Sequence, residues 1–327
     1  MKSLGLSRYA LAIGVASALL AGCGGSQPPI GPTNVIAHVD PSDRRAAIPA
    51  YNSSKPLLFV ANSSEGPITI YEARVNDPKP LAAITKGLLN PAGVCVDGDG
   101  TLYIVNDGND TIREYALGKT RPFQIITHGL LSPAFCAIDH VGNLWVTNMG
   151  DRDLVEYNKG KTHPHKITKD GLTNPGGIAI DRAGNLYVAN NMAGYSQSNI
   201  QVYAAGSKAP TRTITDGITW PIGLAVDRHN TLYVANLSLG RSLGPGNVEE
   251  YRFGESTPYR TITDKIINPA DVAVDKAGWL YVASSAHTTR EQTAILEFPP
   301  HSLKPSRTIT KGLFNPLGLA YYPPLLP

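Results

Sequence analysis

The sequence predicts an all-β protein, a six-bladed β-propeller with four-stranded antiparallel blades. The first observation behind this is a repeated segment, PGGIAIDRAGNLYVAN at Pro175–Asn190, whose related copies begin at Pro91, Pro133, Pro221, Pro269 and Pro316. The second is that each period holds four short runs rich in β-branched and aromatic residues, separated by Gly, Pro, Asn or Asp. Four short strands in roughly 40 to 50 residues, repeated six times, are typical of propeller blades.

We name the four predicted strands of each blade a, b, c and d; in the clearest copy they are Gly176–Asp181, Leu186–Asn190, Ile200–Tyr203 and Arg212–Thr215. Strand b is apolar on both faces, because each blade is sandwiched between two neighbours. Strand c ends in an aromatic residue in every copy (Tyr71, Tyr115, Tyr157, Tyr203, Tyr251 and Phe298).

The phase of the repeat predicts how the ring closes. The chain enters the domain at a strand b, Leu57–Asn62, and leaves it after a strand a, Leu317–Tyr322. One blade therefore takes three strands from the N-terminal end and one from the C-terminal end. This 3+1 closure predicts one propeller domain over residues 51–327.

The first residues read as an export signal. Lys2 and Arg8 precede the apolar run Leu11–Leu20, which is too short to span a bilayer comfortably. The following Leu-Ala-Gly-Cys, ending at Cys23, resembles the lipobox of bacterial lipoproteins. The resemblance implies a signal peptide over residues 1–22 and a lipid on Cys23, followed by a flexible tether over 23–50 that is rich in Gly and Pro. We therefore expect a membrane-anchored protein of the bacterial cell envelope, with the outer membrane favoured in a Gram-negative organism because no Asp follows Cys23.

The charge balance argues against nucleic acid as a partner. The chain has 29 basic and 26 acidic residues, and removal of the signal peptide takes away Lys2 and Arg8. The mature chain is therefore close to neutral, whereas a nucleic-acid-binding face is strongly basic.

The pattern Pro-x-Gly-hydrophobic-Ala-hydrophobic-Asp-x-x-Gly-Asn-Leu-Tyr-Val-Ala-Asn, as it stands at Pro175–Asn190, resembles NHL repeats. It is also similar, more loosely, to gluconolactonase-like six-bladed propellers and to YVTN repeats. The resemblance covers roughly residues 57–322. It implies the fold but leaves the function open, because NHL propellers include binding platforms, carriers and lyases.

Two sets of polar residues recur with the repeat. An Asp ends strand a in five copies (Asp97, Asp139, Asp181, Asp227 and Asp275), where a short carboxylate can accept backbone N–H bonds in the a–b turn. An Asn ends strand b in five copies (Asn62, Asn106, Asn148, Asn190 and Asn236), with Ser284 as the sixth. Either each Asn caps its own b–c loop, or the five form a ring of amides near the channel mouth that suits a sugar or another neutral polar ligand.

Positions that break the repeat point to function more directly. Strand a carries Gly93, Gly177, Gly223 and Gly318 at one position, which we attribute to crowding at the axis, whereas two blades have Phe135 and Asp271 there. Phe135 and Asp271 lie three blades apart, so we expect them to face each other across the channel, with Asp271 as a carboxylate at its mouth.

Loop lengths indicate a binding face. The d–a and b–c loops open on one face of a propeller, and the b–c loops of the fourth to sixth blades are long (Asn191–Asn199, Leu237–Asn247 and Ser285–Thr293). They carry Tyr195, Arg241, His287 and Arg290, and the neighbouring d–a loop has Trp220 where other copies have Asn or Ser. Because loops on a rigid scaffold often recognise ligands, we predict binding at this face.

Cys95 and Cys136 lie in neighbouring strands a, one repeat position apart. Adjacent positions on a strand point to opposite faces, so the two could either face each other between blades or point apart. A disulfide and free thiols are both open, and we favour buried free thiols.

The sequence leans towards binding rather than catalysis, without deciding between them. The eight His residues do not converge, and no catalytic residue stands out. The leading hypothesis is a tethered monomer without a cofactor that binds a protein, glycan or envelope polymer. The alternative is a metal-assisted hydrolase or lyase for a lactone or sugar-like substrate, with a divalent cation such as Ca²⁺ held by Asp271 and the Asn ring in the central funnel.

Overall fold

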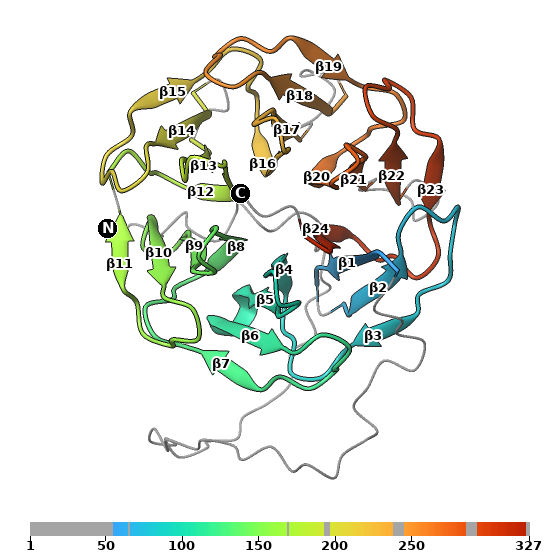
Figure 1. Cartoon of the computed structure of the whole chain (residues 1–327), viewed down its shortest axis with the longest axis horizontal. Coiled ribbons are helices and arrows are strands. Elements are labelled where there is room, and N and C mark those ends of the chain that lie inside the picture. The colour runs from blue at the N-terminus through green and yellow to red at the C-terminus, as the bar shows by residue number, and fades with distance from the viewer. Residues whose placement is uncertain are drawn as a thin grey trace, which may run out of the picture. The chain divides into compact units, whose positions relative to one another are not determined.

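The computed structural model describes residues 55–324, except 65, 169, 193–196, 238–244 and 286–292. These residues form six four-stranded antiparallel sheets around a central axis (Figure 1). The predicted six-bladed propeller is therefore confirmed. No helix in the described part of the chain is long and apolar enough to cross a membrane.

Each blade runs from the axis outward in the order a, b, c, d. In this order, blade 1 comprises β24 (Pro316–Tyr322), β1 (Leu57–Asn62), β2 (Ile68–Glu72) and β3 (Ala82–Ile84); blade 2 comprises β4 (Pro91–Val96), β5 (Leu102–Asn106), β6 (Thr111–Tyr115) and β7 (Gln124–Ile126), with the short 3-10 helix η2 (Asp107–Asn109) before β6; blade 3 comprises β8 (Pro133–Ile138), β9 (Leu144–Asn148), β10 (Asp153–Tyr157) and β11 (Lys166–Thr168).

The second half of the ring repeats this order. Blade 4 comprises β12 (Pro175–Ile180), β13 (Leu186–Asn190), β14 (Asn199–Tyr203) and β15 (Arg212–Ile214); blade 5 comprises β16 (Pro221–Val226), β17 (Leu232–Asn236), β18 (Asn247–Tyr251) and β19 (Arg260–Ile262); blade 6 comprises β20 (Pro269–Val274), β21 (Leu280–Ser284), β22 (Ala294–Phe298) and β23 (Arg307–Ile309).

The ring closes by the predicted 3+1 exchange. The C-terminal strand β24 pairs antiparallel with the N-terminal strand β1, with Leu57 opposite Tyr322 and Ala61 opposite Gly318. Leu57 also lies opposite Glu72, where strand c ends. The described chain therefore enters the propeller on the face that carries the a–b turns and c–d loops, which we call the a–b face. The opposite face, with the d–a and b–c loops, is the b–c face.

The six inner strands approach one another so closely that most of them need Gly at one position. A Cβ atom on Gly93 would lie 2.6 Å from the Cα atom of Phe135 in the next blade. Cβ atoms on Gly177 and Gly318 would collide with the carbonyl oxygens of Ile222 and Ala92. Crowding at the axis therefore explains the repeated glycine, as expected.

Apolar side chains fill the spaces between blades. The interface of blades 1 and 2, for example, buries Leu57, Ile68, Val94 and Ile104 in one cluster. This two-sided burial is why strand b is apolar on both faces.

In four blades the tyrosine at the end of strand c ties its blade to the previous one. The hydroxyl of Tyr157 donates to the carbonyl of His128 at 2.6 Å, and Tyr203 donates to Asp170 at the same distance. Tyr71 and Tyr251 make the equivalent bond to Lys311 and Asp216. All six aromatic side chains are buried, so packing is common to every blade and the hydrogen bond to four of them.

The repeated Asp at the end of strand a holds the a–b turn, as predicted. Oδ1 of Asp181 accepts the backbone N–H groups of Ala183 and Asn185, both at 2.9 Å. Its Oδ2 accepts the hydroxyl of Tyr187 at 3.2 Å. The same arrangement recurs at Asp97, Asp227 and Asp275, and with Trp145 in place of Tyr at Asp139.

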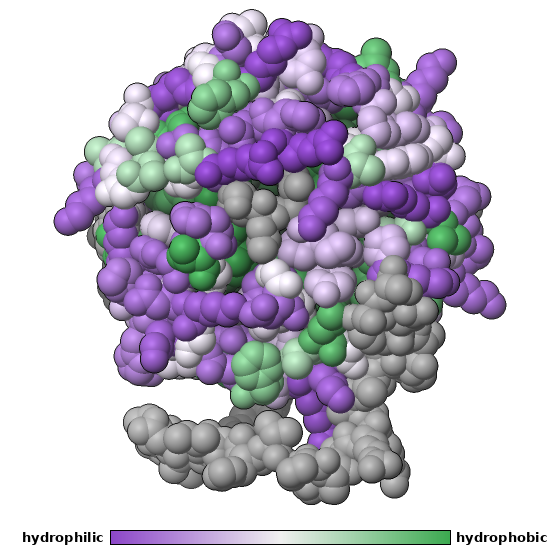
Figure 2. Space-filling view, viewed as in Figure 1, coloured by the Kyte–Doolittle hydropathy of each residue, from purple (hydrophilic) through white to green (hydrophobic). Residues whose placement is uncertain are grey.

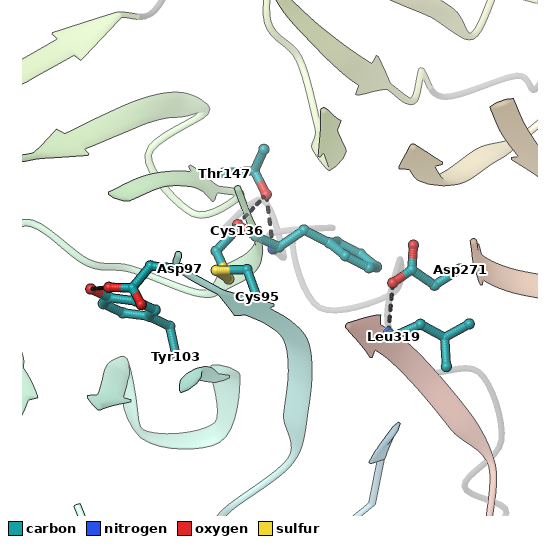
Figure 3. Close-up of a disulfide and its surroundings, with 8 residues drawn as sticks. Cys95, Asp97, Tyr103, Cys136, Thr147, Asp271 and Leu319 are labelled. Carbon is teal, nitrogen blue, oxygen red and sulfur yellow. Dashed lines mark hydrogen bonds between the residues drawn. A yellow bond between two sulfur atoms is a disulfide. The ribbon is translucent and has the colours of Figure 1, made fainter. Parts of the chain in front are cut away.

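Cys95 and Cys136 form a disulfide between β4 and β8, with their Cα atoms 5.8 Å apart (Figure 3). Our preference for free thiols was therefore wrong. Neighbouring blades meet through opposite faces of their inner strands, so two side chains offset by one repeat position point towards each other. The offset that we took to separate the thiols is what brings them together.

This disulfide should contribute substantially to stability, because it cross-links residues 41 positions apart. We expect Cys95→Ala with Cys136→Ala to lower the free energy of unfolding by about 4 kcal/mol through a larger loss of chain entropy on folding. Guanidinium titration of the two chains measures the difference. Each single variant should match the double variant. Two free thiols in the unreduced, denatured Cys23→Ser chain would contradict the assignment.

Candidate functional site

The five repeated Asn residues lie inside the blades. All five are at most 1 % exposed. In blade 3, Oδ1 of Asn148 accepts the backbone N–H of Leu131 at 2.6 Å, and its Nδ2 donates to the carbonyl of Gly129 and to Asp153. Asn62, Asn106, Asn190 and Asn236 accept the equivalent N–H, and the Ser284 hydroxyl replaces them in blade 6.

Each Asn therefore joins the end of strand b to the d–a loop that leads into the same blade, and also to strand c. This connection is wider than the cap on the b–c loop that we considered. Because these amides are buried and hydrogen-bonded within the blade, they do not form part of the binding surface that we argue for below.

The side chains that these Asn residues position were not singled out from the sequence. In three consecutive d–a loops, the residue whose backbone N–H the Asn accepts is a large apolar one: Leu89, Leu131 or Phe314. Their side chains are 40, 46 and 41 % exposed, respectively. We call these three residues the apolar crescent; they lie on the b–c face over blades 1 to 3. Leu89 and Leu131 rest on Gly108 and Gly150 of short b–c loops, where a Cβ would meet them at 2.6 and 2.5 Å. The sequence does mark these positions, because Leu89, Leu131 and Phe314 each follow a Leu and precede an Asn or Ser.

Asp271 and Phe135 lie at the crowded glycine level of the inner strands, and both are buried. Oδ2 of Asp271 accepts the N–H of Leu319 in the closing strand at 2.8 Å (Figure 3), and Oδ1 accepts the N–H of Val272 at 2.9 Å. The backbone N–H of Phe135 donates to Thr147 Oγ1 at 2.9 Å. The carboxylate therefore bridges blade 6 and the strand that closes the ring.

Burial raises the pKa of Asp271 to about 8, although its two backbone hydrogen bonds act in the opposite direction. Two other buried carboxyls lie farther out, in strands c. Burial raises the pKa of Glu114 and of Glu297 to about 7, with the Gln124 hydrogen bond opposing the shift for Glu114 and the Arg307 charge opposing it for Glu297. All three carboxyls are therefore partly or mostly neutral at neutral pH.

Below the glycine level, the inner strands surround an open cavity of ≈ 150 Å³ on the axis. Three consecutive residues from each strand a line it, for example Val94–Val96 of β4, and Pro324 lines it as well. Because β24 ends on the a–b face, Pro324 marks the end of the cavity towards that face. Valine, isoleucine and leucine make up about half of the lining residues.

The remaining predicted site residues divide into two groups. Tyr195, Arg241, His287 and Arg290 lie outside the described residues. Trp220 lies in the d–a loop before β16 and is half-buried; its carbonyl accepts the N–H of Leu237 at the start of the long b–c loop of blade 5. Cys23 also lies outside the described part of the chain.

Within the described ranges, no three His, Cys, Asp or Glu side chains lie close enough together to hold a metal ion. A pair of imidazoles, His128 and His163, stacks at the junction of blades 2 and 3 with ring centroids 4.1 Å apart. Nothing in these contacts gives specific support to the metal-assisted alternative. Figure 2 shows one face of the molecule, on which hydrophilic residues predominate and apolar ones are scattered.

No protein-family model matches the chain, and no curated protein matches its sequence. Solved structures match its fold. The chain is similar to one in the crystal structure of a nidogen/laminin complex, with a TM-score of 0.67 and 19 % identity over 81 % of this chain and 98 % of that one. It is also similar to a protein of unknown function from Bacteroides caccae, with a TM-score of 0.64 and 14 % identity over 82 and 98 % of the two chains.

A third similar structure is the hydrazine synthase of Kuenenia stuttgartiensis, with a TM-score of 0.56 and 16 % identity over 73 % of this chain and 72 % of that one. At these identities the likeness establishes the six-bladed propeller fold alone.

Asp271 should make stability depend on pH. Its carboxyl has a pKa near 3.8 when unfolded and about 8 when folded, so the folded state favours the neutral form. This contribution is full below about pH 4 and is lost at roughly 1.4 kcal/mol per pH unit as the pH rises towards 8. Denaturant titrations between pH 5 and 8.5 should show that the free energy of unfolding falls less with rising pH for Asp271→Asn than for the unsubstituted chain. Parallel curves would show that the carboxyl is not buried as described.

Proposed function

We propose that this protein is an exported, lipid-anchored binding module that recognises a macromolecular partner through its b–c face. The observation that carries the proposal is the distribution of features between the two faces. The described chain enters on the a–b face, whereas the apolar crescent of blades 1 to 3 lies on the opposite one, where the long b–c loops of blades 4 to 6 also begin and end. Anchoring through this end of the domain would keep the b–c face free for a partner.

The b–c face is suited to recognition for physical reasons. Hydrogen bonds from buried Asn residues fix the backbone of Leu89, Leu131 and Phe314, so little conformational entropy is lost when a partner covers these side chains. Exposed apolar side chains on a rigid frame favour a protein over a highly hydrated glycan, and we therefore place a protein first among the candidate partners. One of the similar solved structures is a complex of nidogen with laminin, an example of this fold in a complex of two proteins.

Two observations support export to the cell envelope. The lipobox-like segment that ends at Cys23 suits lipidation, and several acyl chains give stable anchoring. The disulfide between Cys95 and Cys136 fits an oxidising compartment, where such bonds persist.

Lipidation can be tested directly. We expect radiolabelled palmitate to be incorporated into the full chain when it is expressed in a bacterium, and the label to be absent from Cys23→Ser, because the acyl chains need this thiol. The variant Cys95→Ala with Cys136→Ala serves as the matched control and should keep the label. Label that persists in Cys23→Ser would exclude this anchor.

Partner binding can be tested by comparing the two faces. The Cys23→Ser chain is used as bait for an envelope extract, and bound proteins are quantified. Replacing Leu89, Leu131 and Phe314 by Ser should reduce capture of a specific partner at least tenfold, and shortening the three long b–c loops should do the same. Replacing the exposed Val141, Phe253 and Leu303 of the a–b face by Ser is the control and should leave capture unchanged. Equal losses from both faces, or no saturable partner, would refute the proposal.

A further inference from the structure

Exposed charged side chains are distributed unevenly between the two faces of the propeller. On the a–b face, the described residues expose twelve Lys and Arg side chains but only two carboxylates, those of Asp99 and Glu255. On the b–c face, the described residues expose four Lys and Arg side chains and three Asp side chains. The nearly neutral charge of the whole chain therefore hides one strongly basic face.

The twelve exposed cations form a ring, because each blade contributes two of them. We call this set the basic ring; in blade order it comprises Lys55, Lys79, Lys119, Arg121, Lys159, Lys161, Arg182, Lys208, Arg228, Arg252, Lys276 and Lys304. Contacts between neighbouring loops show that they share one surface. Lys159 in the c–d loop of blade 3 reaches Asp99 in the a–b turn of blade 2, and the N–H of Arg182 donates to Asn230 in the a–b turn of blade 5.

Nearby carboxylates do not cancel the charge of the basic ring. Two of its members are paired, Lys55 with Glu72 and Lys159 with Asp99. The other described carboxyls at this end, apart from the exposed Glu255, are half-buried or buried. With all of them counted, the loops of the a–b face and the strand ends beside them have 17 Lys and Arg against 13 Asp and Glu, whereas the rest of the described chain has 5 against 9.

Large apolar side chains are exposed in the same loops. Val141 in the a–b turn of blade 3 is 58 % exposed, and Phe253 in the c–d loop of blade 5 is 54 % exposed. Leu303 and Phe123, in the c–d loops of blades 6 and 2, are each 49 % exposed. All but Val141 lie within two residues of a member of the basic ring; these members are Arg252, Lys304 and Arg121.

The apolar crescent of the opposite face lacks this combination. No Lys or Arg lies within two residues of Leu89, Leu131 or Phe314 in the sequence. The a–b face thus offers apolar side chains among cations, whereas the b–c face offers apolar side chains in loops of mixed charge. The two faces are therefore suited to different partners.

The surface of a bilayer meets both features of the a–b face at once. It presents the phosphates of anionic lipids, and apolar atoms begin just beneath them, so cations and apolar side chains of one face gain together. A nucleic acid offers its phosphates along a line, whereas the basic ring spreads over all six blades. A soluble polyanion would also leave the apolar side chains beside the cations in water.

We propose that the a–b face docks onto a membrane surface rich in anionic phospholipids, with the basic ring against the lipid phosphates and the apolar loop residues among the headgroups. The described chain enters the propeller at this same face, where Leu57 lies opposite Tyr322 and Glu72. Docking in this orientation turns the b–c face away from the membrane.

This inference deepens the proposed function and rests on it for the orientation of the partner-binding face. The docking itself requires neither the lipid on Cys23 nor a bound partner. Palmitate labelling and partner capture are measured without vesicles, so the failure of either proposal is seen independently of the other.

The test is co-sedimentation of the Cys23→Ser chain, which carries no lipid, with vesicles of equal parts phosphatidylglycerol and phosphatidylcholine. We expect saturable binding to these vesicles, and at least tenfold weaker binding to vesicles of phosphatidylcholine alone. Raising the salt from about 0.05 to 0.5 M should release most of the bound chain, because screening shortens the range of the attraction.

Matched variants assign the binding to one face. Replacing Lys161, Lys208 and Lys304 of the basic ring by Gln should weaken vesicle binding at least tenfold. Replacing Lys86, Arg152 and Lys265 of the b–c face by Gln removes the same charge and should change binding less than twofold. The N-terminal segment is the same in both variants, so the difference between them reports on the propeller.

A second pair of variants tests the apolar contribution. Replacing Val141, Phe253 and Leu303 by Ser should also weaken vesicle binding, because their burial among the headgroups is lost. The crescent variant, with Leu89, Leu131 and Phe314 replaced by Ser, should bind vesicles as the unsubstituted chain does.

Several outcomes would overturn the docking proposal. They are equal binding to vesicles without phosphatidylglycerol, equal losses from the two sets of Gln variants, and no loss from the Ser variant of the a–b face. Duplex DNA or free glycerol phosphate, at the same total phosphate concentration, should displace little of the bound chain. Complete displacement by either would assign the basic ring to a soluble anion instead of a membrane.

Discussion

The close approach of the six inner strands at the axis is the constraint on which the rest of the structure depends. It requires Gly at one position of most inner strands, because a Cβ atom would meet the backbone of the next blade. The same proximity places Cys95 and Cys136 within disulfide distance and lets Asp271 reach the N–H of the closing strand. The axial cavity also depends on how these strands fit together.

The repeated polar residues make structural contacts within the blades. Each Asp after strand a satisfies the N–H groups of a tight turn, and each Asn after strand b holds the d–a loop of its blade. Because buried polar groups are costly unless they are paired, these contacts recur wherever the backbone geometry recurs. Function is therefore to be sought where the repeat is broken or where it presents a variable side chain, as the Asn-held d–a loops do at Leu89, Leu131 and Phe314.

The two faces of the propeller differ in what they present. The described chain enters on the a–b face, whereas the b–c face offers exposed apolar side chains whose backbone is held by buried Asn residues. The faces of a propeller can differ in this way because its loops vary without disturbing the inner strands. Burial without a cationic partner raises the pKa of Asp271, an arrangement that costs stability at high pH.

The sequence by itself determined the fold class, the six blades, the 3+1 closure and the turn role of the repeated Asp, because these depend on local patterns that recur along the chain. It also identified Asp271 and Phe135 as departures from the glycine rule. Only the tertiary structure decided which faces of neighbouring strands meet, and hence that Cys95 and Cys136 are joined, that the Asn amides are buried and that Asp271 is bound by backbone N–H groups. Those outcomes depend on contacts between blades. Side chains one residue apart point to opposite faces of a single strand, but the inner strands of neighbouring blades meet through opposite faces, so the same offset brings the two Cys side chains together.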